Sequence, residues 1–109
     1  MKAALIDQRR FTAIARNGAI IFVHMDLFKV SEKEAPKHPG GYRFSWIAFN
    51  AEDPKKKVLF DSHPPKGAHF HIDGDKKGVS FVWESAKQAE ALFFAMVAAH
   101  FNIDPEELQ

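Results

Sequence analysis

The sequence contains no cysteine. This absence excludes disulfide bonds, thiolate nucleophiles and zinc sites built on thiolate ligands. Long apolar runs are also missing, since no stretch approaches the ~20 apolar residues that a membrane-spanning helix needs. The short apolar start gives way to charged residues at Asp7, so the sequence predicts no signal peptide. We therefore expect a cytoplasmic protein that makes no contact with a membrane.

Neither sign of charge dominates, because the formal net charge is +1 with histidine neutral. Global charge therefore argues neither for nor against a nucleic-acid partner. The chain has 109 residues, of which 46% are hydrophobic and 27% charged, and this is typical of one globular domain over 1–109. Eleven phenylalanines stand beside a single tyrosine, and a core rich in Phe suits a small sheet.

Strand signals fill the first two thirds of the chain. Apolar runs rich in β-branched and aromatic residues predict strands over 5–15, 19–28, 42–50, 58–61 and 69–72, with 78–83 as a further candidate. Asn17–Gly18 is a hairpin signal, because both positions of a two-residue turn need a positive φ. In the second strand the odd-numbered residues from Ile21 to Leu27 share one face, which we expect to be the core face.

A capped helix is predicted over 85–101. Ser85 is the expected N-cap, and Gln88 three residues later completes a capping box. The predicted apolar stripe consists of Ala89, Leu92, Phe93, Met96 and His100. Further apolar residues widen this stripe, so the helix needs cover on more than one side. The fold class is therefore α+β: an antiparallel β-meander of four to six strands with one C-terminal helix packed on a face, and we expect a homodimer.

No strong catalytic motif is present, and the informative segment is 61–71. It contains Asp61, His63, Lys66, His69 and His71. Because His69 and His71 are two residues apart, a strand would place both imidazoles on one face. Three interpretations stay open. The residues form a solvated strand end; the two imidazoles act as general acid and base while Lys66 stabilises an anionic transition state; or the pair binds a divalent metal together with His63 or Asp61.

Two other groups of residues have functional and structural interpretations. Arg43 could hold a phosphate group. The aromatic stripe Tyr42, Phe44 and Trp46 could stack bases as a platform for single-stranded nucleic acid. We favour a core role for the stripe, because the chain needs apolar surface to cover the helix.

The order of these segments resembles the TumE-type toxins of bacterial toxin–antitoxin pairs. The likeness covers most of the chain and rests on His38, residues 42–44 (Y-R-F), 60–62 (F-D-S) and 66–71 (K-G-A-H-F-H). The family pattern in the last segment reads roughly K-G-D-H-x-H, and Ala68 stands here in place of the acidic residue. The resemblance implies a toxin that is blocked by a helix-turn-helix antitoxin and that acts on RNA.

The leading hypothesis is a toxin-like, metal-independent ribonuclease without a cofactor. One of His69 and His71 would take the proton from a 2′-hydroxyl, and the other would protonate the leaving oxygen. Lys66 and Arg43 would stabilise the charged phosphorane, with Asp61 as a further catalytic residue and His63 in binding. The alternative is a non-catalytic binding module that uses the sheet face or the helix for a protein partner.

Overall fold

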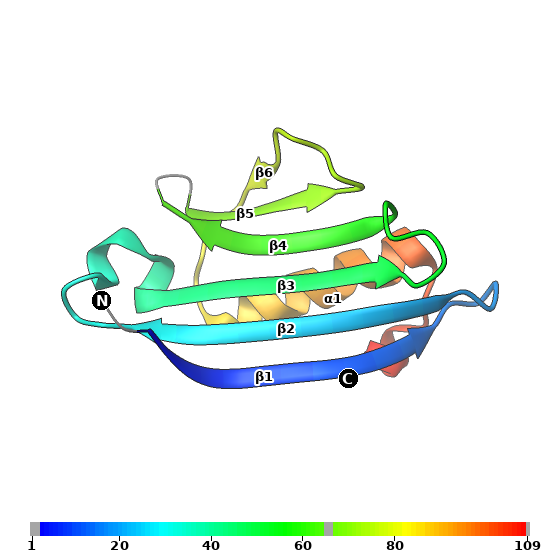
Figure 1. Cartoon of the computed structure of the whole chain (residues 1–109), viewed down its shortest axis with the longest axis horizontal. Helices are drawn as coiled ribbons and strands as arrows, with labels where there is room; N and C mark the ends of the chain where they lie inside the picture. The colour runs from blue at the N-terminus through cyan, green and yellow to red at the C-terminus, as the bar shows by residue number, and fades with distance from the viewer. Residues whose placement is uncertain (1–2, 65–66, 109) are drawn as a thin grey trace.

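The computed structural model describes residues 3–64 and 67–108 (Figure 1). In this part of the chain six strands form one antiparallel sheet, and each strand pairs with the next along the chain. The strands are β1 (Ala3–Ile14), β2 (Ile20–Val30), β3 (Tyr42–Asn50), β4 (Lys57–His63), β5 (Gly67–Ile72) and β6 (Val79–Ser80). Short 3₁₀ turns are η1 (Ala35–Lys37), η2 (Pro39–Gly41) and η3 (Pro105–Leu108). The predicted α+β meander is thus confirmed.

The C-terminal helix α1 (Ala86–Phe101) lies across one face of the sheet (Figure 1). Its start is capped as predicted, because the Ser85 hydroxyl accepts a hydrogen bond of 3.0 Å from the backbone N–H of Gln88. Its end is the left-handed residue Asn102, with a φ of 56°. No helix among the described residues is both long enough and apolar enough to cross a membrane.

Strand alternation gives the sheet an inner face toward α1 and an open face on the other side. The predicted core face of the second strand is confirmed, since Ile21, Val23 and Met25 are fully buried. Phe44 and Trp46 are also buried, and Trp46 packs against Phe93 of α1 with ring centroids 5.8 Å apart. The aromatic stripe is therefore core and does not offer a base-stacking platform.

The buried stripe of the helix differs from the prediction. Leu92 and His100 are exposed, whereas Phe93, Val97 and Phe101 are buried. The row that faces the sheet recurs every four residues and consists of Ala89, Phe93, Val97 and Phe101. Leu92 and His100 each precede a member of this row, so they lie about 100° away from it around the helix axis. The ring of His100 lies near the sheet's end instead, with Nε2 2.8 Å from a carboxylate oxygen of Asp73.

Two connections also differ from the sequence-based prediction. The β1–β2 connection is not a two-residue turn: only Gly18 has a positive φ, of 88°, and the strands end at Ile14 and restart at Ile20. The side-chain oxygen of Asn17 accepts from the Ala19 N–H at 3.0 Å, which stabilises this longer loop. Residues 78–83 form only the two-residue β6, because Trp83 turns to the inner face and stacks on Phe44 at 5.2 Å.

Candidate functional site

The hairpin of β4 and β5 brings three polar side chains together on the open face. In its register Asp61 lies opposite His69, and His71 follows two residues later on the same face. The intervening residues point inward, where Phe60 and Phe70 stack with centroids 5.1 Å apart. One hairpin therefore has an aromatic side against α1 and an imidazole–carboxylate side away from it. We call Asp61, His69 and His71 the histidine cluster.

His69 is buried between two hydrogen-bond acceptors. Its Nδ1 lies 2.8 Å from the backbone oxygen of Gly67, and its Nε2 lies 2.7 Å from Oδ1 of Asp61. Its side chain is only 6% exposed. A carbonyl oxygen can only accept, so Nδ1–H donates to Gly67. In the neutral tautomer Nε2 then turns a lone pair toward the carboxylate, and this contact is favourable only with a proton or another cation between the two atoms.

His71 is held in a similar way by backbone. Its Nδ1–H donates to the carbonyl oxygen of Asp75 at 2.5 Å, which leaves Nε2 as the nitrogen with an available lone pair. The rings of His69 and His71 meet edge to face with centroids 5.0 Å apart. His71 is half-buried, so the cluster has one enclosed imidazole and one that reaches the surface.

The loop after β5 determines where His71 can lie. Gly78 has a φ of 71°, and a Cβ atom there would come within 2.7 Å of Cε1 of His71. The start of this loop is fixed to β4, because the N–H of Asp73 donates to the Lys57 oxygen at 2.8 Å and its carboxylate accepts from the Lys57 N–H at 2.9 Å. Sequence reasoning missed Asp75 and Gly78, although a turn rich in Asp and Gly directly after His-x-His was a visible signal.

The carboxylate of Asp61 is poorly satisfied. Its Oδ1 atom is buried and accepts no well-aligned hydrogen bond from the residues that the structure describes, despite its 2.7 Å distance to Nε2 of His69. Buried carboxylate oxygens without such a partner are uncommon in folded proteins. The oxygen therefore marks a place where a cation or a proton donor is expected.

Two other predicted site residues, Arg43 and His63, do not join the histidine cluster. The guanidinium of Arg43 lies over the ring of Phe28 at 4.7 Å, on the side of β2, and so points away from β4. His63 is exposed at the end of β4 on the same face as Asp61. Lys66 lies outside the described residues. The structure thus brings together three of the six predicted site residues: Asp61, His69 and His71.

The open face continues from the histidine cluster across β3 and β2. One row of paired residues runs His24, Ile47, Leu59 and His71. Next to this row Phe49 packs edge to face on Phe22 and on His24, each pair with centroids 5.6 Å apart. Three strand spacings separate His24 from His71, a span of about 14 Å.

A charged pair lies at the β1 side of this face. Arg10 forms an ion pair of 3.0 Å with Asp26, and the amide of Gln8 donates to the same carboxylate at 3.0 Å. The hydrogen bond from Arg10 outweighs the effect of partial burial and lowers the pKa of Asp26 below its ordinary value.

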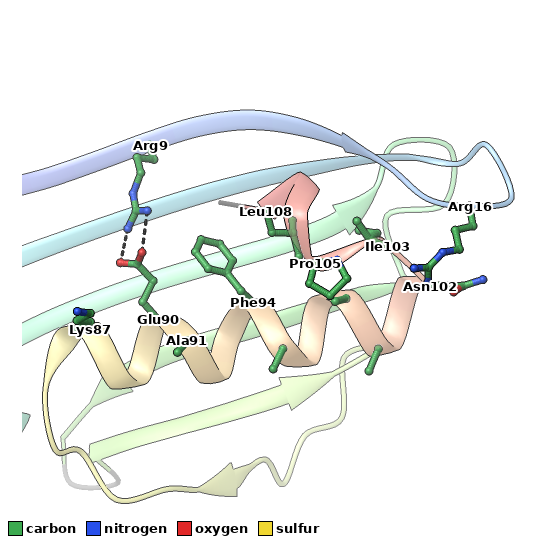
Figure 2. Close-up of a pocket in the computed structure, with 13 residues that line it drawn as sticks. Arg9, Arg16, Lys87, Glu90, Ala91, Phe94, Asn102, Ile103, Pro105 and Leu108 are labelled. Atoms are coloured by element: carbon green, nitrogen blue, oxygen red, sulfur yellow. Dashed lines mark hydrogen bonds and ion pairs between the residues drawn. The ribbon is translucent and has the colours of Figure 1, made fainter.

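A hollow of about 780 Å³ lies elsewhere, between α1, β1 and η3 (Figure 2). We call it the helix groove. Phe94, Ala98 and Leu108 contribute to its apolar lining. Figure 2 shows Arg9 of β1 and Glu90 of α1 pointing toward one another at one end, where they form a two-fold hydrogen bond of 2.9 and 2.5 Å. This bond raises the pKa of Arg9.

Comparison with protein-family models, with curated proteins and with solved structures finds no match to this chain. The resemblance to TumE-type toxins therefore stays a prediction. The geometry of the histidine cluster and of the helix groove supplies the argument for function.

Proposed function

We propose that the protein is a toxin-like ribonuclease whose chemistry takes place at the histidine cluster. One observation carries the proposal: two imidazoles with backbone-fixed Nδ1 atoms lie side by side, and one of them is 2.7 Å from a carboxylate. Paired imidazoles are suited to acid–base catalysis, because histidine can donate or accept a proton near neutral pH. An RNA target would place this action in the cytoplasm.

We infer the roles of the two histidines from their burial. His71 reaches the surface and is the base that takes the proton from the 2′-hydroxyl. The resulting oxyanion attacks phosphorus, and the bond from phosphorus to the 5′-oxygen breaks. His69 shares a proton between its Nε2 atom and Oδ1 of Asp61, and the Asp61 side chain, which is 31% exposed, passes this proton to the leaving oxygen. The products are a 2′,3′-cyclic phosphate and a free 5′-hydroxyl, so protons and electrons balance without a co-reactant.

The rest of the open face supports a single-stranded substrate. Phe22 is 37% exposed and lies with Phe49 beside the row that leads to His71. Exposed aromatic rings stack unpaired bases, and arginines attract the phosphate backbone. Arg43, whose guanidinium lies over Phe28 on the same face, would contact a phosphate along the bound RNA and not the reacting phosphorus. Lys66 keeps its proposed role in stabilising the phosphorane.

The test is RNA cleavage, and growth arrest on induction, by the wild type and the His69→Ala/His71→Ala double variant. We expect the double variant to lose roughly 10²–10⁴ in cleavage rate, the usual share of a general acid or base. His24→Ala is the matched control, because it removes an imidazole from the same face outside the histidine cluster. A melting curve confirms that each variant is folded. Equal cleavage by the double variant and the wild type would contradict the proposal.

The helix groove favours a second function, which is binding of a protein partner. Its walls are apolar and its rim carries Arg16 and Lys87, so it suits an amphipathic helix with acidic residues, such as a segment of an antitoxin. Ala95→Arg would place a charged side chain in the groove and should abolish capture of such a partner while leaving RNA cleavage intact. If no RNA is cleaved and Ala95→Arg alone removes the biological effect, the protein is a binding module.

The predicted homodimer would cover the same side of α1. Ala91 and Ala95 are exposed on it, and Leu92 next to them is 37% exposed. Light scattering at high micromolar concentration should give twice the monomer mass for the wild type and the monomer mass for Ala95→Arg. A monomeric wild type would contradict the prediction and leave the helix groove to a different protein.

A further inference from the structure

The histidine cluster has the donor atoms of a metal site. Asp61, His69 and His71 each offer one ligand atom, and these three atoms lie within 4.8 Å of one another. Two imidazoles and one carboxylate form a donor set used by zinc and by other first-row transition metals. The residues come from neighbouring strands of one hairpin, so a rigid element positions all of them.

The hydrogen bonds of the two imidazoles prepare them for coordination. Metal-bound histidines usually donate the N–H of the other ring nitrogen to a backbone carbonyl or a carboxylate, which fixes the tautomer. His69 donates through Nδ1 to Gly67, and His71 donates through Nδ1 to Asp75. Both therefore keep the lone pair on Nε2 for a cation. The orphaned Oδ1 atom of Asp61 is the third donor.

We propose that Asp61, His69 and His71 form a binding site for a divalent transition metal ion of the Zn²⁺ class. Ligand distances of about 2.1 Å require donor atoms roughly 3.0–3.4 Å apart. On binding, the 2.7 Å contact between Asp61 and His69 therefore opens by a few tenths of an ångström, and donor atoms that lie up to 4.8 Å apart draw closer through side-chain rotation. The ion then lies between two atoms that otherwise need a proton to face each other. Water or a substrate oxygen fills the remaining positions, because the three side chains do not complete a tetrahedron.

Metal binding does not require RNA cleavage, but the two exclude each other at any moment because they use the same lone pairs. An ion on Nε2 of His69 and His71 removes both the acid and the base of the proposed mechanism. A metal-loaded protein is therefore expected to be inactive as a metal-independent ribonuclease. The bound cation would then inhibit RNA cleavage.

The test is titration of the wild-type protein with Zn²⁺ by calorimetry, with Co²⁺ absorption as a second readout and Mg²⁺ as the comparison ion. We expect one Zn²⁺ per chain, visible-region Co²⁺ bands, and no heat from Mg²⁺, which prefers oxygen ligands. Asp61→Asn and His71→Ala should each weaken Zn²⁺ binding by at least about tenfold. His24→Ala is the control that should bind as the wild type does, because His24 lies outside the histidine cluster.

The outcomes separate this inference from the proposed function. Absence of stoichiometric Zn²⁺ binding overturns the metal site, whether or not RNA is cleaved. Unchanged binding by His71→Ala also overturns it, because the ion would then be held by other surface histidines. Stoichiometric binding that both cluster variants weaken supports the metal site even if the protein cleaves no RNA.

Discussion

The two faces of the β4–β5 hairpin carry different kinds of side chain, although its strands are only seven and six residues long. On the inner face Phe60 is fully buried and meets Phe70 and Phe93, so removal of a ring leaves a cavity. On the open face Asp61 and His69 meet across the same pair of strands, with Nε2 of His69 2.7 Å from Oδ1 of Asp61. The comparison teaches that neighbouring positions contribute to different properties, the inner ones to stability and the open ones to the proposed chemistry.

The largest expected effect lies on the inner face. Phe93→Ala should lower the free energy of unfolding by about 3–5 kcal/mol, because the side chain is fully buried against Trp46 and Phe60 and its removal leaves a cavity. Chemical denaturation of both proteins measures the difference. A loss below about 1 kcal/mol would mean that the inner face does not depend on this contact. At a low temperature at which the Phe93→Ala variant is folded, it should still bind Zn²⁺ at the open face.

Gly78→Ala tests whether the open face can be disturbed without the core. The new Cβ would lie 2.7 Å from Cε1 of His71, and the φ of 71° is unfavourable for alanine. We expect a loss of about 1–2 kcal/mol in stability and a clear loss of function at the histidine cluster. Gly18→Ala is the matched control, since its φ of 88° carries the same strain and a Cβ there meets nothing within 4 Å. If both variants lose function equally, the contact with His71 is irrelevant.

The helix cap contributes to stability alone. Ser85→Ala removes the acceptor for the Gln88 N–H and should cost about 1 kcal/mol in the free energy of unfolding, with RNA cleavage and metal binding unchanged. Gln88→Ala keeps the bond, because the donor is backbone, and should be close to neutral. If the Ser85 variant lost function while remaining folded, the helix cap would contribute to function as well as to stability.

The smallest expected effect is the pH dependence of the Arg10–Asp26 pair on the open face. The pKa of Asp26 is lowered by Arg10 in the folded chain, so its stabilising contribution is present above the unfolded pKa and is lost as pH falls through the folded value. The difference in unfolding free energy between wild type and Asp26→Asn should be below about 1 kcal/mol near neutrality. It should shrink below about pH 4. A difference that is constant from neutral to acidic pH would show that the pair contributes nothing.

The fold was predictable because its signals are local. The strand at 42–50 and the face of Ile21 follow from alternation, and the helix start follows from Ser85. The helix stripe was predicted less well, because periodicity alone does not say which apolar row meets the sheet. Leu92 and Phe93 are equally apolar in the sequence, and only packing against Trp46 selects Phe93.

The site was predictable in part. Two-residue spacing places His69 and His71 on one face, but the partnership of Asp61 with His69 depends on the register of the β4–β5 hairpin. The contacts of His69 with Asp61 and Ser80 likewise follow from strand pairing, which the spacing of the histidines does not give. Arg43 was assigned to the site on its charge alone. In the structure its guanidinium lies over the ring of Phe28 on the neighbouring strand β2, at 4.7 Å, and not in the histidine cluster.

The short loop after β5 has a consequence for the entropy of the site. Asp73 is bonded to Lys57 at the start of β4 and contacts His100 in the last turn of α1, while Asp75 two residues later accepts from His71. The carbonyl that orients His71 is therefore ordered by folding, before any substrate or ion arrives. A ligand at the histidine cluster therefore does not lose affinity by immobilising this loop. If the contact between Asp73 and His100 were removed, the loop would be ordered only on binding, and the entropy lost in ordering it would lower the affinity.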